Sequence, residues 1–224
     1  MKNISLMSKK FITKYWHFVF VLYTPIYLYT FFTLENMAYK KTTIIHMPLD
    51  DMIPFCKYFI IPYLIWFIYI FAAIAFFFFY SRREFIRYAS FLIIGMSVCL
   101  AIYALFPSEL QLRPVTVDTS DIFGYLVNII YRTDTPTNVC PSIHCLNSFA
   151  THIAILKCGY FRKRPALIRL SFILMVMICL STLFLKQHSV YDVMGAALLA
   201  VILYVIIYKI FPPAKDKELR QNTL

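Results

Sequence analysis

A run of 22 residues without a charged side chain, Phe59–Tyr80, constrains the fold of this chain more than any other feature. About 20 apolar residues in a helix span the hydrocarbon core of a bilayer. The composition agrees, since 61% of the residues are hydrophobic, 15% are charged and the mean hydropathy is +0.69, whereas about 25% of the residues in soluble domains are charged. The sequence therefore predicts a polytopic membrane protein and excludes a soluble globular domain.

Windows free of charge predict six transmembrane helices. They cover about Tyr15–Leu34, Phe59–Tyr80, Tyr88–Phe106, Ile143–Leu156, Ala166–Leu185 and Val190–Tyr208. No internal repeat or low-complexity linker divides the sequence, so we expect one all-α domain over residues 1–224, a six-transmembrane-helix bundle. The first apolar stretch has no small-x-small cleavage site and is expected to be a span rather than a signal peptide.

The basic residues predict the orientation of the bundle, because Lys and Arg beside spans stay in the cytoplasm. Of the 22 Lys and Arg residues, 16 lie in the two tails or beside the predicted loops 81–87 and 157–165, and six lie on the other side. Both termini are therefore expected in the cytoplasm, and the loops at 35–58, 107–142 and 186–189 outside. The net charge of +11 is then mainly a signal of topology, so we expect no nucleic-acid partner.

The six cysteines contain no Cys-x-x-Cys pair, which argues against a zinc site or a disulfide framework. A single disulfide on the outer side, among Cys56, Cys140 and Cys145, stays open. Two neighbouring carboxylates, Asp50 and Asp51, could hold a headgroup or a metal, but acidic pairs in loops are usually only hydrated. We expect no metal and no cofactor.

One outer segment that indicates chemistry is Asn138–Cys145. Pro141 fits the first turn of a helix, so the fourth span is expected to begin near Cys140. The free backbone N–H groups of a helix start, with the Ser142 hydroxyl, can hold an anion, and His144 would face that anion one turn further on. The alternative is an ordinary helix start with a partly exposed histidine.

The segment Lys186–Asp192 opens the sixth span at the same surface. Residues four apart share a helical face, so Asp192 can accept a hydrogen bond from one ring nitrogen of His188. The other nitrogen is then free to act as a base or nucleophile. The alternative is a capping box, in which Ser189 and Asp192 begin an ordinary helix. With Arg113 in the long outer loop, these groups describe phosphate chemistry at a membrane surface.

These segments together resemble the motifs of the type 2 phosphatidic acid phosphatase (PAP2) superfamily of membrane lipid phosphatases and phosphotransferases. The segment Pro141–His144 is similar to its Pro-Ser-x-His motif, and Ser181–Asp192 to its Ser-Arg-(x5)-His-(x3)-Asp motif. Phe106–Pro114 aligns with its Lys-(x6)-Arg-Pro motif. The resemblance implies one integral membrane PAP2-like domain over residues 1–224 with the set His144, His188 and Asp192.

The sequence departs from the family pattern at two cations, because the lysine of the first motif is Phe106 and the arginine of the third is Thr182. Such losses resemble the branch that contains inositol phosphorylceramide synthases and sphingomyelin synthases. Phosphate binding is then expected from Arg113, Ser142 and the start of the fourth span. Lys186 is the nearest cation that could compensate, and its alternative is an ordinary lysine at a span end.

The resemblance implies an enzyme of the cell membrane whose site faces the periplasm or exterior. We expect a phosphatase that hydrolyses a lipid phosphomonoester or pyrophosphate through a phosphohistidine, with His188 as nucleophile and His144 as proton donor. The first alternative is a phosphotransferase that moves a phospho-headgroup onto a lipid hydroxyl. A transporter is remote, because such proteins have Gly- or Pro-broken spans and midplane charges, whereas this chain has four glycines and interfacial charges. The oligomeric state stays open.

Overall fold

The computed structural model describes residues 22–37 and 42–210, and most of these are helical. Two short strands, β1 (Thr43–Ile44) and β2 (Ser108–Glu109), pair in parallel. The helices are α2 (Tyr23–Glu35), α3 (Pro48–Met52), η2 (Lys57–Phe59), α4 (Ile60–Tyr80), α5 (Arg82–Leu105), α6 (Ile122–Thr133), α7 (Ile143–Lys157), α8 (Gly159–Arg162), α9 (Pro165–Phe184), α10 (Val190–Tyr204) and the π-helical η3 (Val205–Ile210).

Within these described residues, four helical stretches are long and apolar enough to cross a membrane: Lys57–Tyr80, Arg82–Leu105, Pro165–Phe184 and Val190–Ile210. This agrees with a polytopic membrane protein. The first predicted span lies partly outside the described residues, and α2 covers only its second half. The predicted fourth span is α7, whose 15 residues measure about 22 Å, less than the ~30 Å of a hydrocarbon core. Six spans and cytoplasmic termini stay predictions.

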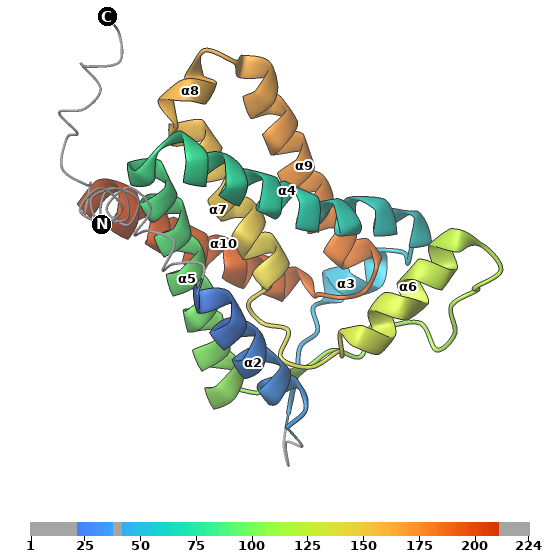
Figure 1. Cartoon of the computed structure of the whole chain (residues 1–224). Coiled ribbons are helices and arrows are strands. Elements are labelled where there is room, and N and C mark those ends of the chain that lie inside the picture. The colour runs from blue at the N-terminus through green and yellow to red at the C-terminus, as the bar shows by residue number, and fades with distance from the viewer. Residues whose placement is uncertain (1–21, 38–41, 211–224) are drawn as a thin grey trace, which may run out of the picture.

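Helix α7 occupies the centre of the bundle and packs against α4, α5, α9 and α10 (Figure 1). Its small residues Ala150, Thr151 and Ala154 are buried, which lets neighbouring backbones approach closely. On α5, a Cβ added at Gly95 would lie 2.9 Å from the Leu146 side chain, so only glycine fits there without a shift. The central position explains how so short a helix is held.

One predicted boundary and the predicted place of Pro141 are wrong. Helix α5 begins at Arg82 rather than near Tyr88, because Ser81 alone separates it from α4 and caps it by accepting from Glu84 N–H. Charge-free windows mark the end of the apolar surface, not the end of the helix. Helix α7 begins at Ile143 with Ser142 as its cap, so Pro141 precedes the helix instead of lying in its first turn.

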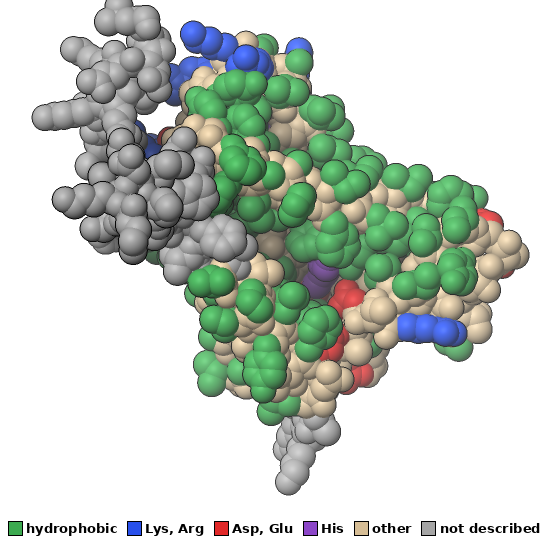
Figure 2. All heavy atoms as spheres, in the orientation of Figure 1, with side chains coloured by type: hydrophobic (Ala, Val, Ile, Leu, Met, Phe, Trp, Pro, Cys, Tyr) green, Lys and Arg blue, Asp and Glu red, His purple; other side chains and the backbone are tan. Residues whose placement is uncertain are grey.

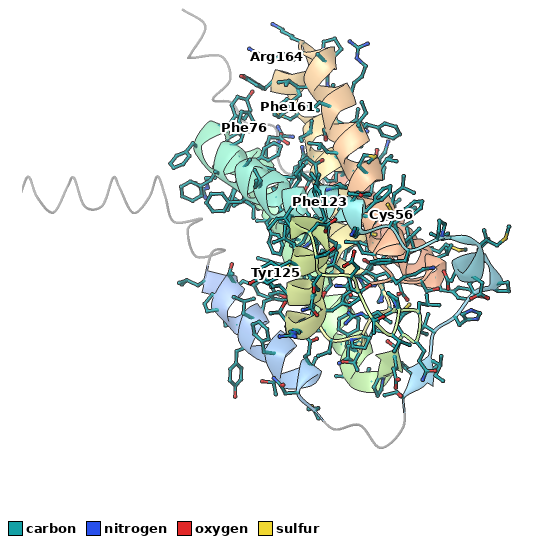
Figure 3. The ribbon with its side chains drawn as sticks, turned by 90° about the vertical axis from the view of Figure 1, so that its right-hand side faces the viewer. Cys56, Phe76, Phe123, Tyr125, Phe161 and Arg164 are labelled. Carbon is teal, nitrogen blue, oxygen red and sulfur yellow. The ribbon has the colours of Figure 1, made fainter. Side chains whose placement is uncertain are left out.

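The loops predicted on the outer side meet at one end of the bundle. The Cys56 N–H donates to Phe184 O at 3.0 Å, and the Ser142 N–H donates to Asp192 O at 3.1 Å. This end carries α2, α3 and α6, while α8 lies at the opposite end (Figure 1). In the perpendicular view, Arg164 lies far from Tyr125 of α6 (Figure 3). The fold thus gathers the motif residues on one side of the bundle.

Candidate active site

The pair His188 and Asp192 lies at the junction of α9 and α10. The His188 Nδ1 and Asp192 Oδ2 are 3.2 Å apart, as the spacing predicts. Although His188 precedes the helix, the connecting turn holds it in place, since Gln187 N–H and His188 N–H both donate to Thr182 O at 2.9 and 3.1 Å. Because Asp192 engages Nδ1, the second ring nitrogen, Nε2, is the one left for other partners.

The capping box is also present, together with the contact between His188 and Asp192. Asp192 Oδ2 accepts the Ser189 N–H at 2.8 Å, and Ser189 Oγ accepts from Tyr191 N–H at 3.2 Å. The carboxylate is fully buried. Burial alone would lower the pKa of His188, but the hydrogen bond and the charge of Asp192 outweigh it and hold that pKa above its ordinary value. The arrangement favours a ring of fixed orientation.

His144 faces His188 from the first turn of α7, with the two ring centroids 5.8 Å apart. Its imidazole packs beside the rings of Tyr63 and Trp66, at centroid distances of 4.8 and 4.5 Å. The Trp66 Nε1–H also donates to His144 O at 3.1 Å. Helix α4 therefore fixes the position of His144, a contribution that the motif alone does not predict.

Both histidines line a cavity of about 470 Å³, here called the histidine cavity. Polar side chains, among them Asp134, Asn138 and Gln187, line one part of it, and apolar and aromatic side chains, many of them from α2 and α4, line the rest. Figure 2 shows histidine and acidic side chains together in a hollow between hydrophobic surfaces. A smaller cavity of about 300 Å³ lies against His152 and contains neither His144 nor His188. The histidine cavity is therefore the candidate active site.

Arg113 reaches this site through an intermediate side chain. Its guanidinium donates to Gln187 Oε1, to Asp134 O at 2.8 Å and to Tyr131 O at 3.2 Å. It also stacks on the Tyr131 ring, with Cζ 4.4 Å from the centroid. Arg113 is thus close to the histidines but lies behind Gln187 rather than in the cavity lining.

Ser142 is fully buried and joins two helices rather than lining the cavity. Its Oγ accepts from Cys145 N–H at 3.3 Å, and its N–H donates to Asp192 O at 3.1 Å. These contacts hold the start of α7, and so His144, beside the start of α10. In this structure Ser142 positions the site, and its hydroxyl is not brought to the cavity.

The placement of Lys186 corrects the expectation that it compensates for the missing cations. Its ammonium donates to Asp50 O at 2.6 Å and Ile53 O at 2.5 Å. The side chain is only 7% exposed and lies outside the cavity lining. A lysine that satisfies two buried carbonyls is not free to hold a phosphate.

The two positions that lack the family's cations also lie outside the cavity lining. Phe106 is 70% exposed after the end of α5. Thr182 is fully buried in α9, where its Oγ1 donates to Cys179 O at 2.8 Å. Neither Phe106 nor Thr182 therefore occupies the space beside the histidines.

Sequence reasoning missed two polar residues of the cavity, Gln187 and Asp134. Gln187 Nε2 donates to Asp134 Oδ2 at 3.4 Å, and Tyr63 Oη donates to the same oxygen at 3.0 Å. Burial raises the pKa of Asp134 above its ordinary value. The position of Gln187, next to His188, was the one available signal, whereas Asp134 reaches the site only through the fold of the outer loop.

No group of three or more His, Cys, Asp and Glu side chains in residues 22–37 and 42–210 has the arrangement of a metal site. Of the two neighbouring carboxylates, Asp51 pairs with His46 at 2.9 Å and is largely exposed. Asp50 is 2% exposed, which contradicts the expectation that both are hydrated. The reason is that its carboxylate faces the loop before α10.

Fold and site together define an α-helical membrane protein with a histidine pair and a buried carboxylate at one end of its bundle. The family model of the PAP2 superfamily matches residues 107–216. The chain therefore belongs to the PAP2 superfamily, whose members are phosphatases and phosphotransferases acting on phosphate esters. Searches of curated proteins and of solved structures gave no match.

Proposed function

We propose that this protein is a lipid phosphatase that cleaves a phosphomonoester or pyrophosphate through a phosphohistidine. The observation that carries the proposal is the facing pair His144 and His188, with ring centroids 5.8 Å apart at a cavity and Asp192 on Nδ1 of His188. A nucleophile held by an orienting carboxylate opposite a second proton-transfer group is the arrangement that group transfer through a covalent intermediate requires.

In the first step, His188 Nε2 attacks phosphorus and the bond from phosphorus to the leaving oxygen breaks. His144, in its protonated form, gives a proton to that oxygen. In the second step, a water attacks the phosphohistidine, neutral His144 takes its proton, and the P–N bond breaks. Asp192 keeps Nδ1 protonated throughout, so that the lone pair stays on Nε2.

The shape of the cavity supports a lipid substrate. Helix α2 packs mainly against α5, and the histidine cavity lies between α2 and α4. Phe32 of α2 and Phe67 of α4 line it while remaining 51% and 53% exposed. A hydrocarbon chain could contact these rings from the bilayer while its phosphate reaches the histidines. The apolar contacts would then contribute to binding in proportion to the area they bury.

The phosphate charge needs positive partners, because an anion is costly to bury without hydrogen bonds. Arg113 supplies a full charge close by and polarises Gln187, whose amide it binds. The N-terminus of α7 adds the positive end of a helix dipole next to His144. We assign phosphate binding to the start of α7, with the charge of Arg113 acting through Gln187, and not to Lys186.

A phosphotransferase is the second candidate, and Asp134 favours it. Its half-buried carboxyl lines the histidine cavity and accepts from Tyr63 Oη at 3.0 Å. A carboxylate in this place can accept a hydrogen bond from an alcohol, which could then replace water in the second step. The resemblance to inositol phosphorylceramide and sphingomyelin synthases points the same way.

The proposed setting is the cell membrane, with the histidine cavity facing the periplasm or exterior. The charge distribution of 16 Lys and Arg on one side and six on the other supports this orientation. The motif residues lie at the end of the bundle that also carries α6 with Arg132 and the contacts of Arg113 and Lys186.

Purified protein in detergent or vesicles tests the proposal. Phosphatidate, a polyprenyl pyrophosphate and a phosphodiester lipid are each supplied with and without an added long-chain alcohol, and released phosphate and new lipid products are measured. Phosphate release without alcohol supports the phosphatase. A new phosphorylated product that needs the alcohol supports the transferase. No turnover of any of them by wild-type protein would contradict the proposal, and the His188→Ala variant is the background control.

A further inference from the structure

The short helix α3 holds the loop that carries His188, although the contacting residues lie about 140 positions apart. Ser189 Oγ donates to Asp50 Oδ2 at 2.6 Å, and Val190 N–H donates to Asp50 Oδ1 at 2.9 Å. Met47 N–H donates to Oδ2 as well, at 2.8 Å. Both oxygens of this buried carboxylate are therefore engaged, two of its three donors coming from the start of α10.

In a second contact, the loop before α10 supplies the side chain and the α3 segment supplies the backbone acceptors. The Lys186 ammonium donates to the carbonyl oxygens of Asp50 and Ile53. Lys186 itself has a φ of 53°, in the left-handed region that non-glycine residues adopt only where their surroundings fix them. We name these contacts of Asp50 with Lys186, Ser189 and Val190 the Asp50 clasp.

We propose that Asp50 is a positioning residue for the reaction at His188. It fixes Ser189, whose N–H shares the acceptor Asp192 Oδ2 with the His188 ring. Asp50 does not line the histidine cavity, so it would act through Ser189 rather than on substrate. The inference rests on the proposed function, since it assumes that His188 reacts.

The cost of burying a carboxylate supports this assignment. A charge away from water is destabilising unless it is fully hydrogen-bonded, and an apolar side chain would fill the same space at less cost. Helix α10 already has a cap in Ser189 and an acidic first-turn residue in Asp192. A second buried acid is therefore not needed to start the helix, whereas it is needed to hold the Ser189 hydroxyl in one place.

The test is a double-mutant cycle between Asp50→Asn and Ser189→Ala, with Asp51→Asn as the matched control. Each of the first two variants is expected to lower kcat at least tenfold and leave KM within twofold, because orientation of the nucleophile changes and substrate contacts do not. Asp51 is exposed and pairs with His46, so its variant should keep wild-type kcat. The double variant should be no slower than the worse single variant, because both substitutions remove the same contact between Ser189 and Asp50.

A spectroscopic measurement on the same variants does not depend on turnover. Protein with ¹⁵N-labelled histidine is compared by NMR, with His188→Gln giving the assignment. In wild-type protein the His188 signals should report a proton fixed on Nδ1, and Ser189→Ala, which removes no charge, should shift them towards a mixture of tautomers. If Asp50→Asn does not fold, Ser189→Ala still tests the contact between these two residues.

The outcomes separate the two proposals. The role of Asp50 would be overturned by any one of three results. These are a kcat of the double variant reduced by the product of the two single losses, a rise in KM at constant kcat, and unchanged His188 signals in Ser189→Ala. Absence of turnover in wild-type protein, with the His188 signals still responding to Ser189→Ala, would contradict the proposed function and leave the clasp supported.

Discussion

His188 and Asp192 are in contact through one carboxylate oxygen of Asp192. Nδ1 of the His188 ring lies 3.2 Å from Asp192 Oδ2, and the Ser189 N–H donates to the same oxygen at 2.8 Å. One carboxylate thus begins helix α10 and orients the imidazole. Because the same oxygen carries both contacts, the start of the helix and the direction of the ring are coupled. A change at Asp192 should therefore affect both stability and chemistry.

Asp192→Asn is expected to lower kcat by about two orders of magnitude or more, because an amide can leave the His188 proton on the wrong nitrogen. Asp192 raises the pKa of His188, and attack needs the unprotonated Nε2. The acid limb of the kcat profile should therefore lie above pH 6.5 in wild-type protein and move to lower pH in the variant. A limb that stays in place while kcat falls would show that Asp192 does not act on His188.

His144→Ala should distinguish substrates by their leaving groups. A leaving oxygen of low pKa needs no proton, so the variant should lose far less rate on an aryl phosphate than on an alkyl phosphate. Initial rates on a matched pair of esters measure this. Equal losses on both would argue that His144 only shapes the cavity.

Gln187→Ala should lower kcat/KM about tenfold, equivalent to ~1.4 kcal/mol of transition-state stabilisation. The physical reason is that Gln187 binds both Arg113 and Asp134 at the cavity. Gln111→Ala is the control, since Gln111 contacts Glu109 away from the cavity lining. Equal kinetics for the two variants would remove Gln187 from the site.

Lys186→Met should lower the free energy of unfolding by roughly 1–3 kcal/mol, because buried carbonyls lose their donor. The variant should leave KM within twofold. Lys163→Met is the control, because Lys163 is exposed at the end of α8. A tenfold rise in KM at unchanged stability would instead return Lys186 to phosphate binding.

The orientation of the protein can be tested by labelling single cysteines in a background without native cysteines. Val115 is fully exposed in the loop between β2 and α6, so Val115→Cys should react with an impermeant reagent on intact cells. Lys163→Cys, at the opposite end of the bundle, should react only after permeabilisation. The reverse pattern would place the histidine cavity in the cytoplasm.

The apolar runs were sufficient to predict most of the helices, because in a bilayer the length of an apolar segment is set by the hydrocarbon thickness. The contact between His188 and Asp192 was also predicted, although His188 precedes α10 and the turn that donates to Thr182 O, not a shared helical face, brings the two together. The central position of α7 was not, because small residues that permit close packing carry no strong signal in hydropathy.

The roles of Lys186 and Asp50 were beyond sequence reasoning for a different reason. Lys186 contacts Asp50 across 136 positions, and Ser189 contacts Asp50 across 139. Such contacts depend on how the outer loops fold over the bundle end, not on local spacing. A lysine near His188 therefore suggested phosphate binding, and a loop carboxylate suggested hydration, although the fold pairs the two segments.

The most direct test of the central claim is to trap the covalent intermediate. Protein is mixed for milliseconds with a lipid phosphate carrying ³²P, quenched in alkaline denaturant, and digested to locate the label. Our account predicts acid-labile, alkali-stable ³²P on His188, which Asp192→Asn diminishes and His188→Ala abolishes together with turnover. A His188→Ala protein that folds and still turns over the same substrate, or label on another residue, would contradict it.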